Sequence, residues 1–196
     1  MFNIHFLKKE SLPSVDALQI QGRDIKIVVG LGNPVEGYEA SYHNAGFLFL
    51  DFLTSLYPNN GVGKSQNFKN IKSFAYARLG GLVFAKPTTL MNNSGKAVKE
   101  LLRYFDASPS ELLVVHDDSD IPFGEYKFSF GRGSAGHNGA ESIIKYIGTV
   151  EFLRLRIGVR NTNQKAGDFV LSKIPKDKLG DLENLFAEIK TSHFKV

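Results

Sequence analysis

The stretch that most constrains the fold of this chain covers residues 25–46, where a short apolar run, a glycine-rich loop and a helix-length apolar segment follow one another. β-Branched side chains at the start of the stretch predict a buried strand, and the sequence Gly-Leu-Gly-Asn-Pro ends it. The apolar residues over 47–53 predict a helix. This order puts Asn33 and His43 near the end of a strand, which is the edge where open α/β sheets bind ligands.

The remaining elements alternate in the same way along the 196 residues, a length that suits one medium domain. Strands are expected at 25–30, 74–79, 82–86, 112–117, 126–130 and 152–159, and helices at 44–56, 94–105, 137–147 and 176–190. This alternation predicts an α/β fold, here a single domain with a mixed, mostly parallel twisted sheet flanked by helices. We expect residues 24–196 to form this domain and residues 1–23 to form an N-terminal extension.

The composition excludes several kinds of protein. The chain has no cysteine, so disulfides, thiolate catalysis and cysteine-ligated metal sites are excluded, and the sequence suits a reducing compartment. No apolar run approaches the roughly 18–20 residues of a membrane-spanning helix, and residues 1–23 have no apolar signal-peptide core. We therefore expect a cytoplasmic protein with no membrane partner.

Basic residues are concentrated in one segment, although the formal net charge of the chain is only +4. The segment 127–165 holds seven basic residues against two acidic ones, a local excess of +5. The basic residues are Lys127, Arg132, Lys145, Arg154, Arg156, Arg160 and Lys165. Such a segment suits a polyanion such as nucleic acid, and the alternative is a solvated basic surface.

Polar side chains also follow several of the expected strands. Asp117 ends an expected strand, Asn92 follows one after a turn, and Asn138 lies at the start of an expected helix. A parallel sheet would bring all three to the same edge as Asn33 and His43. A neutral imidazole can take a proton from water, a neighbouring carboxylate can orient it, and carboxamides can donate to a carbonyl oxygen. This set predicts hydrolysis by an activated water, with His43 as base and Asp117 as its partner.

Each of these residues also has a purely structural interpretation. A single histidine is more often a surface or core residue than a catalytic one, Asp117 can cap a turn, and asparagines are common in turns. His116 is a rival base, but neighbouring residues of a strand point to opposite faces, so it does not easily share a site with Asp117. The acidic residues that follow could hold a divalent cation, although their spacing is not that of an EF-hand.

Four motifs, in order along residues 25–175, resemble the bacterial-type peptidyl-tRNA hydrolase family. They are Gly30-Leu-Gly-Asn-Pro with Tyr38 and His43-Asn-Ala-Gly, Lys86-Pro-Thr-Thr-Leu-Met-Asn-Asn-Ser-Gly, His116-Asp-Asp-Ser-Asp-Ile-Pro, and Gly136-His-Asn-Gly followed by Leu155-Arg-Ile-Gly. The resemblance implies a monomeric α/β esterase, cytoplasmic or organellar, that releases the peptide from peptidyl-tRNA without a metal or a cofactor.

The same resemblance implies a role for each matching residue. His43 resembles the general base and Asp117 its orienting partner. Contacts with the peptide and with the 3′ end of the tRNA are implied for Asn33, Tyr38, Met91, Asn92 and Asn138. The side that faces tRNA, the expected partner, is implied for Lys127, Arg154 and Arg156, to which the charge of the segment adds Arg132.

Three places depart from the family pattern. Ser41-Tyr42 stands where the family has Thr-Arg, Val35 replaces a glycine, and Ser129 replaces a basic residue. These changes bear on tRNA affinity more than on the chemistry. Two alternatives stay open at this point. One is a non-catalytic RNA-binding protein on the same fold, and the other is a metal-dependent hydrolase that uses the His-Asp-Asp sequence at 116–118.

Overall fold

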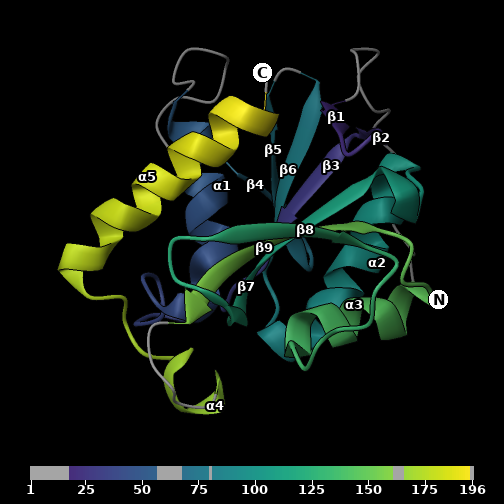
Figure 1. Ribbon diagram of the computed structural model, residues 1–196. Coiled ribbons are helices and arrows are strands. Elements are labelled where there is room, and N and C mark those ends of the chain that lie inside the picture. The colour runs from purple at the N-terminus through teal and green to yellow at the C-terminus, as the bar shows by residue number, and fades with distance from the viewer. Residues whose placement is uncertain (1–17, 57–67, 80, 161–165, 195–196) are drawn as a thin grey trace.

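Strands and helices alternate along the part of the chain that the computed structural model describes, residues 18–56, 68–79, 81–160 and 166–194 (Figure 1). The strands are β1 (Leu18–Ile20), β2 (Arg23–Ile25), β3 (Ile27–Gly30), β4 (Lys69–Ile71), β5 (Phe74–Leu79), β6 (Leu82–Pro87), β7 (Leu112–Pro122), β8 (Tyr126–Phe130) and β9 (Leu153–Arg160). The α-helices are α1 (Ala45–Ser55), α2 (Ser94–Phe105), α3 (Asn138–Ile147), α4 (Ala166–Phe169) and α5 (Lys176–His193). Residues 1–17 of the expected extension, and Lys165, lie outside the described residues.

Within the described ranges, seven strands form one mixed sheet in the order β4-β5-β6-β3-β7-β9-β8. The central strand β3 pairs in parallel with β6 and β7, and β7 pairs in parallel with β9. The outer pairs, β4 with β5, β5 with β6 and β8 with β9, are antiparallel. The predicted α/β fold with a mixed, mostly parallel sheet is therefore confirmed.

Helices cover both faces of this sheet (Figure 1). α1 and α5 pack on one face, and α2 and α3 pack on the other. The central strands are therefore buried on both sides, as their unbroken apolar runs at 27–29 and 112–115 require. Burial of these runs fixes the position of each strand end and of the polar residues that follow it.

A short antiparallel hairpin precedes the sheet. β1 and β2 pair with Leu18 opposite Ile25, and both side chains are buried in the core together with Ile20. Ile25 thus belongs to the hairpin, and the strand expected at 25–30 begins at Ile27. The sequence did not reveal the hairpin because each of its strands has only three residues, too few for an alternating pattern.

Most of the expected elements end within two residues of their observed bounds. β7 differs more, because it continues to Pro122 through an irregular register opposite β9, and α5 extends to His193. The edge strand β4, with its polar Lys69 and Asn70, was not expected. None of the helices in the described ranges is long and apolar enough to cross a membrane.

Two glycines let α1 begin directly against the ends of β3 and β7. A Cβ on Gly30 would lie less than 3.0 Å from the carbonyl oxygen of Gly46, and a Cβ on Gly46 would lie equally close to the carbonyl oxygen of Val115. Both positions are too close to backbone for any side chain. The turn ahead of α1 therefore packs against β7, and His43 can reach Asp117, which follows Val115 by two residues.

Candidate active site

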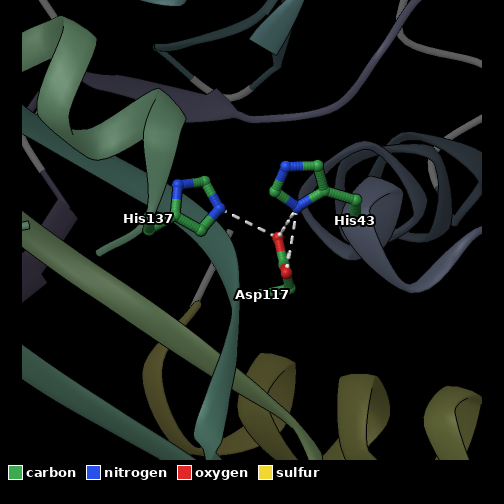
Figure 2. A group of neighbouring side chains, drawn as sticks. All are labelled: His43, Asp117 and His137. Atoms are coloured by element: carbon green, nitrogen blue, oxygen red, sulfur yellow. Dashed lines mark hydrogen bonds and ion pairs between the residues drawn. The ribbon is translucent and has the colours of Figure 1, made fainter. Parts of the chain in front are cut away.

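A histidine and an aspartate from distant parts of the sequence meet at the carboxyl edge of the sheet (Figure 2). His43 lies in the 3-10 turn Tyr42–Asn44 ahead of α1, and Asp117 lies in β7. The Nδ1 atom of His43 is 2.9 Å from Oδ1 and 3.0 Å from Oδ2 of Asp117. The backbone N–H of His43 donates to the carbonyl oxygen of Val170 at 2.8 Å. The structure thus brings together the two residues predicted as base and orienting partner.

Burial and hydrogen bonds set the charges of this pair. Asp117 is only 2% exposed. Burial alone would raise the pKa of its carboxyl, but the electrostatic attraction to His137 and hydrogen bonds from both rings hold that pKa well below its usual range. Burial likewise lowers the pKa of His43, yet the hydrogen bond to Asp117 and the charge of that carboxylate outweigh it, so the net pKa is raised above 6.5.

The hydrogen bond also decides which nitrogen of His43 can act as a base. An ionised carboxylate only accepts hydrogen bonds, so Nδ1 carries the proton of the neutral ring. The other nitrogen, Nε2, is turned away from Asp117 (Figure 2), and His43 lines two cavities. In this tautomer Nε2 can take a proton from water, and Asp117 stabilises the imidazolium that results.

All five residues predicted to contact the substrate line one groove beside His43. The groove has a volume of about 300 Å³, and these residues are Asn33, Tyr38, Met91, Asn92 and Asn138. Val35, Leu90 and Leu171 also line it, as apolar side chains that are 42–53% exposed. Among its described lining residues none is acidic. The groove combines apolar surface, carboxamides and one imidazole.

Asn33 is held at this groove by its neighbours. Its backbone N–H donates to Asn44 Oδ1 at 2.7 Å, and Asn44 Nδ2 donates to the carbonyl oxygen of Asn33 at 3.2 Å. The side-chain oxygen of Asn33 accepts from the N–H of Met91 at 2.9 Å. The NH2 group of Asn33 is therefore the donor that this side chain can offer to a ligand. Sequence reasoning gave Asn44 no role, although its place next to His43 was a signal.

A second cavity, of about 280 Å³, contains the Asp117 side of the site. It is also lined by His137, to which sequence reasoning gave no role. His137 Nε2 is 2.9 Å from Oδ1 of Asp117 (Figure 2), and its ring centroid is 5.0 Å from that of His43. The Gly-His-Asn-Gly motif at the start of α3 was the available signal, but it was interpreted through Asn138 alone.

The rival base, His116, opens to neither cavity. Its side chain is fully buried, and its Nδ1 donates to the backbone carbonyl oxygen of Asp117 at 2.6 Å. Burial is the main cause that holds the pKa of His116 well below its usual range. Its ring packs against that of His137, with centroids 4.4 Å apart. His116 therefore packs against His137 and has no access to a water in either cavity.

The basic residues predicted to face tRNA differ in exposure. Lys127 in β8 and Arg132 in the following loop are exposed. Arg156 lies opposite Lys127 in the β8–β9 pair, and its Nε donates to Asp118 Oδ2 at 2.7 Å. The side chain of Arg156 is still 21% exposed. Lys127, Arg132 and Arg156 thus form a basic surface, with the charge of Arg156 partly balanced.

Arg154 requires a correction. Its side chain is only 2% exposed, and its Nη2 donates to the carbonyl oxygens of Arg132 at 3.1 Å and Gly133 at 2.8 Å. A buried guanidinium with backbone partners cannot reach a tRNA phosphate. Instead of binding tRNA, Arg154 anchors the glycine-rich loop that leads to His137.

His43, Asp117 and His137 also have the spacing of a metal site, since one ligand atom of each lies within 4.8 Å of the others. Both ring nitrogens that face Asp117, however, are hydrogen-bonded to an anionic carboxylate and so carry protons. A metal ion would require these nitrogens without protons. The arrangement fits hydrogen bonding better than metal binding. In the alternative His-Asp-Asp set at 116–118, His116 is fully buried and lines neither cavity.

Fold and site together define an α/β protein with a buried histidine–aspartate pair at the carboxyl edge of its sheet, an arrangement that suits a hydrolase. Comparison with known proteins identifies the family, because the model of the peptidyl-tRNA hydrolase family matches residues 27–193. This chain belongs to the peptidyl-tRNA hydrolase family.

Relatives and solved structures agree with this assignment. The chain is similar to the peptidyl-tRNA hydrolase of Aquifex aeolicus, with 47% identity over 145 residues, or 72% of this chain and 73% of that protein. It is 38% identical to the Mycoplasma capricolum peptidyl-tRNA hydrolase over 83% of this chain and 87% of that protein. The crystal structure of peptidyl-tRNA hydrolase from Acinetobacter baumannii superposes with a TM-score of 0.72 at 29% identity, covering 85% of each chain.

Proposed function

We propose that this protein hydrolyses the ester bond of peptidyl-tRNA and releases the peptide and free tRNA. The observation that carries the proposal is the His43–Asp117 pair, whose imidazole lines a groove shared with the carboxamides of Asn33, Asn92 and Asn138. The relatives named peptidyl-tRNA hydrolase support this choice of substrate.

The reaction needs one activated water and donors for a developing oxyanion. The ester joins the terminal carboxyl of the peptide to a ribose hydroxyl of the tRNA. Water adds to the ester carbonyl as Nε2 of His43 takes its proton, and the NH2 groups of Asn33, Asn92 and Asn138 are the donors that the groove offers to the oxyanion. The imidazolium then returns the proton to the ribose oxygen as the carbon–oxygen bond breaks.

The two parts of the substrate find different surfaces. The peptide lies in the groove, against the apolar side chains of Val35, Leu90 and Leu171. The tRNA lies along the basic surface of Lys127, Arg132 and Arg156, whose cations complement its phosphates. One chain carries all of these residues, so we propose that the protein acts as a monomer. We also propose that it acts in the cytoplasm, as the resemblance to this family implies.

The test compares N-acetylated aminoacyl-tRNA with unblocked aminoacyl-tRNA. Because no described residue lining the groove is acidic, a charged ammonium finds no partner there, and we expect cleavage of the blocked substrate only. A non-catalytic RNA-binding protein would bind tRNA and leave both esters intact. A metal-dependent hydrolase would lose its turnover in EDTA, whereas we expect turnover that EDTA does not change.

The pH dependence of kcat/KM should follow the protonation of His43. Its pKa is raised above 6.5 because the hydrogen bond and charge of Asp117 outweigh the opposing effect of burial. A general base must be neutral, so activity should rise with pH and reach half of its plateau above pH 6.5. Initial rates between pH 5 and 9, with chemistry limiting, measure this limb. A profile that is flat from pH 5 to 8 would count against a histidine base.

Removing cations from the basic surface should weaken tRNA binding and leave the chemistry intact. Replacing both Lys127 and Arg132 by alanine should raise KM for full-length peptidyl-tRNA. The slope of log KM against log salt should fall by roughly 0.7–0.9 for each lost phosphate contact. Cleavage of a short substrate that ends in the 3′-terminal nucleotide should hardly change, since this piece reaches His43 without touching the basic surface.

The matched control removes the same charge from α5, which packs on the same face of the sheet as α1 (Figure 1). Replacing Lys176 and Lys190 by alanine should leave KM and its salt dependence as in the parent protein. If the Lys127 and Arg132 variant is folded and loses equal activity on the long and short substrates, the basic surface does not bind tRNA.

A further inference from the structure

His137 contacts both the start of α3 and the catalytic pair. Its Nδ1 accepts hydrogen bonds from the backbone N–H groups of Gly139 at 3.1 Å and Ala140 at 3.2 Å, so the imidazole is the N-cap of α3. Its Nε2 lies 2.9 Å from Oδ1 of Asp117. Figure 2 shows the two nitrogens of this ring pointing in opposite directions, with Nε2 toward Asp117.

The cap fixes the tautomer of the ring. A nitrogen that accepts from backbone N–H groups presents its lone pair to them and cannot carry a proton. A proton on Nδ1 would set a third N–H against the two N–H groups of Gly139 and Ala140 and would remove the cap of α3. The neutral ring therefore carries its single proton on Nε2, which donates to Asp117.

We propose that His137 is a positioning residue: the cap of α3 locks its tautomer so that Nε2–H donates to Asp117, and this hydrogen bond tunes the basicity of His43. The kinetic part of this inference rests on the proposed hydrolysis, whereas the lock itself does not. Oδ1 of Asp117 accepts from His137 and from His43, both at 2.9 Å. The hydrogen bond from His137 stabilises part of the negative charge on the carboxylate. Asp117 therefore stabilises the imidazolium of His43 less than it would without this hydrogen bond.

The titratable groups around His137 fit this role. Asp117 and His116 face it from β7, His43 faces it from the turn ahead of α1, and Arg154 of β9 anchors the loop before it. Glu141 lies in the first turn of α3 and is exposed. His116 adds no positive charge, because burial holds its pKa well below the usual range. Asp117 is thus the anion that the Nε2–H group meets.

Local packing explains why a histidine can cap this helix. A Cβ on Gly139 would lie 3.1 Å from Cε1 of His137 and 2.5 Å from the sulfur of Met91. The missing side chain at Gly139 lets the ring lie over the first turn of α3 and lets Met91 approach it. The Gly-His-Asn-Gly sequence therefore serves the cap, in addition to presenting Asn138 to the groove.

Nitrogen-15 NMR of the imidazole rings tests the lock without any assay of hydrolysis. The chain has five histidines, and the signals of His137 are those missing from the spectrum of the His137→Gln variant. We expect the Nε2–H pattern of a neutral ring for His137 at pH 8. An Nδ1–H pattern would overturn the proposal.

Two substitutions separate the two hydrogen bonds in the kinetics. In His137→Gln the amide NH2 can occupy the place of Nε2–H, so the acid limb of kcat/KM should stay where it is in the parent protein. In His137→Asn the shorter amide caps α3 but cannot reach Asp117. The limb should then move to higher pH by roughly 0.5–1 unit, and kcat/KM on the acid side of the limb should fall by roughly three- to tenfold.

Melting curves establish that both variants are folded, and His193→Gln, outside the site, serves as the histidine control. A limb that His137→Asn leaves unmoved would overturn the tuning of His43. If the parent protein hydrolyses no peptidyl-tRNA, the proposed function fails, and the NMR pattern still decides whether His137 is locked.

Discussion

Replacing His43 by alanine is expected to lower kcat by ~10²–10⁴, the range for a lost general base, with little change in KM. The reason is geometric. Nδ1 of His43 is occupied by Asp117 at 2.9 Å, and the free Nε2 is the atom that takes the proton of the attacking water. In the proposed binding mode the tRNA keeps its contacts with the basic surface, so kcat and kcat/KM should fall by the same factor. Single-turnover rates with N-acetylated aminoacyl-tRNA measure the loss.

His193 provides the matched control for this substitution. It lies at the end of α5, where its Nε2 is 3.0 Å from the hydroxyl of Tyr126, and it lines neither cavity of the site. Replacing His193 by alanine should leave kcat within about twofold of the parent value. Melting curves for both variants establish that the chain is folded. If the His43 variant keeps activity within about tenfold of the parent protein, another group is the base.

Local sequence patterns predicted the parts of the fold that depend on burial. The unbroken apolar runs at 27–29 and 112–115 become central strands because both of their faces are covered. The amphipathic spacing over 94–105 becomes α2 with the same bounds. The hairpin at 18–25 was not predicted, because its three-residue strands are stabilised by burial of Leu18 and Ile20 in the core and not by a pattern of their own.

Some residues of the site could likewise be predicted from the sequence, and others could not. His43 and Asp117 could be paired from the sequence because each comes after the apolar run of a central strand, and parallel strands bring such residues to one edge. His137 and Arg154 could not be assigned, because their roles depend on the path of the loop at 131–136. Arg154 was assigned to the tRNA-facing side from its place in the basic segment and from the family resemblance. In the structure the loop covers it, and its guanidinium is held by the carbonyl oxygens of Arg132 and Gly133.

Replacing Asp117 by asparagine is expected to lower kcat by ~10²–10⁴ without a comparable change in KM, since the same change in a serine-protease triad leaves the histidine in the wrong tautomer. Asp117 accepts hydrogen bonds from both His43 and His137. An asparagine has one accepting oxygen and one donating NH2 group, so it cannot accept from both rings in the same way.

The cap of α3 decides which ring must change. His137 cannot move its proton to Nδ1, because that atom accepts from the N–H groups of Gly139 and Ala140. The side-chain oxygen of the introduced asparagine would therefore pair with His137, and its NH2 group would face Nδ1 of His43. The ring of His43 would then carry its proton on Nε2, where it offers water a donor in place of a base.

This mechanism separates the variant from a simple loss of charge. If the only defect were the protonation of His43, a higher pH would restore the rate, but a wrong tautomer stays wrong when the pH rises. We therefore expect no recovery between pH 7 and 9. The matched control is Asp120→Asn, an exposed carboxylate on the same strand, which should keep parent activity. Activity of the Asp117→Asn variant within about tenfold of the parent, or its recovery at high pH, would show that Asp117 does not set the tautomer of His43.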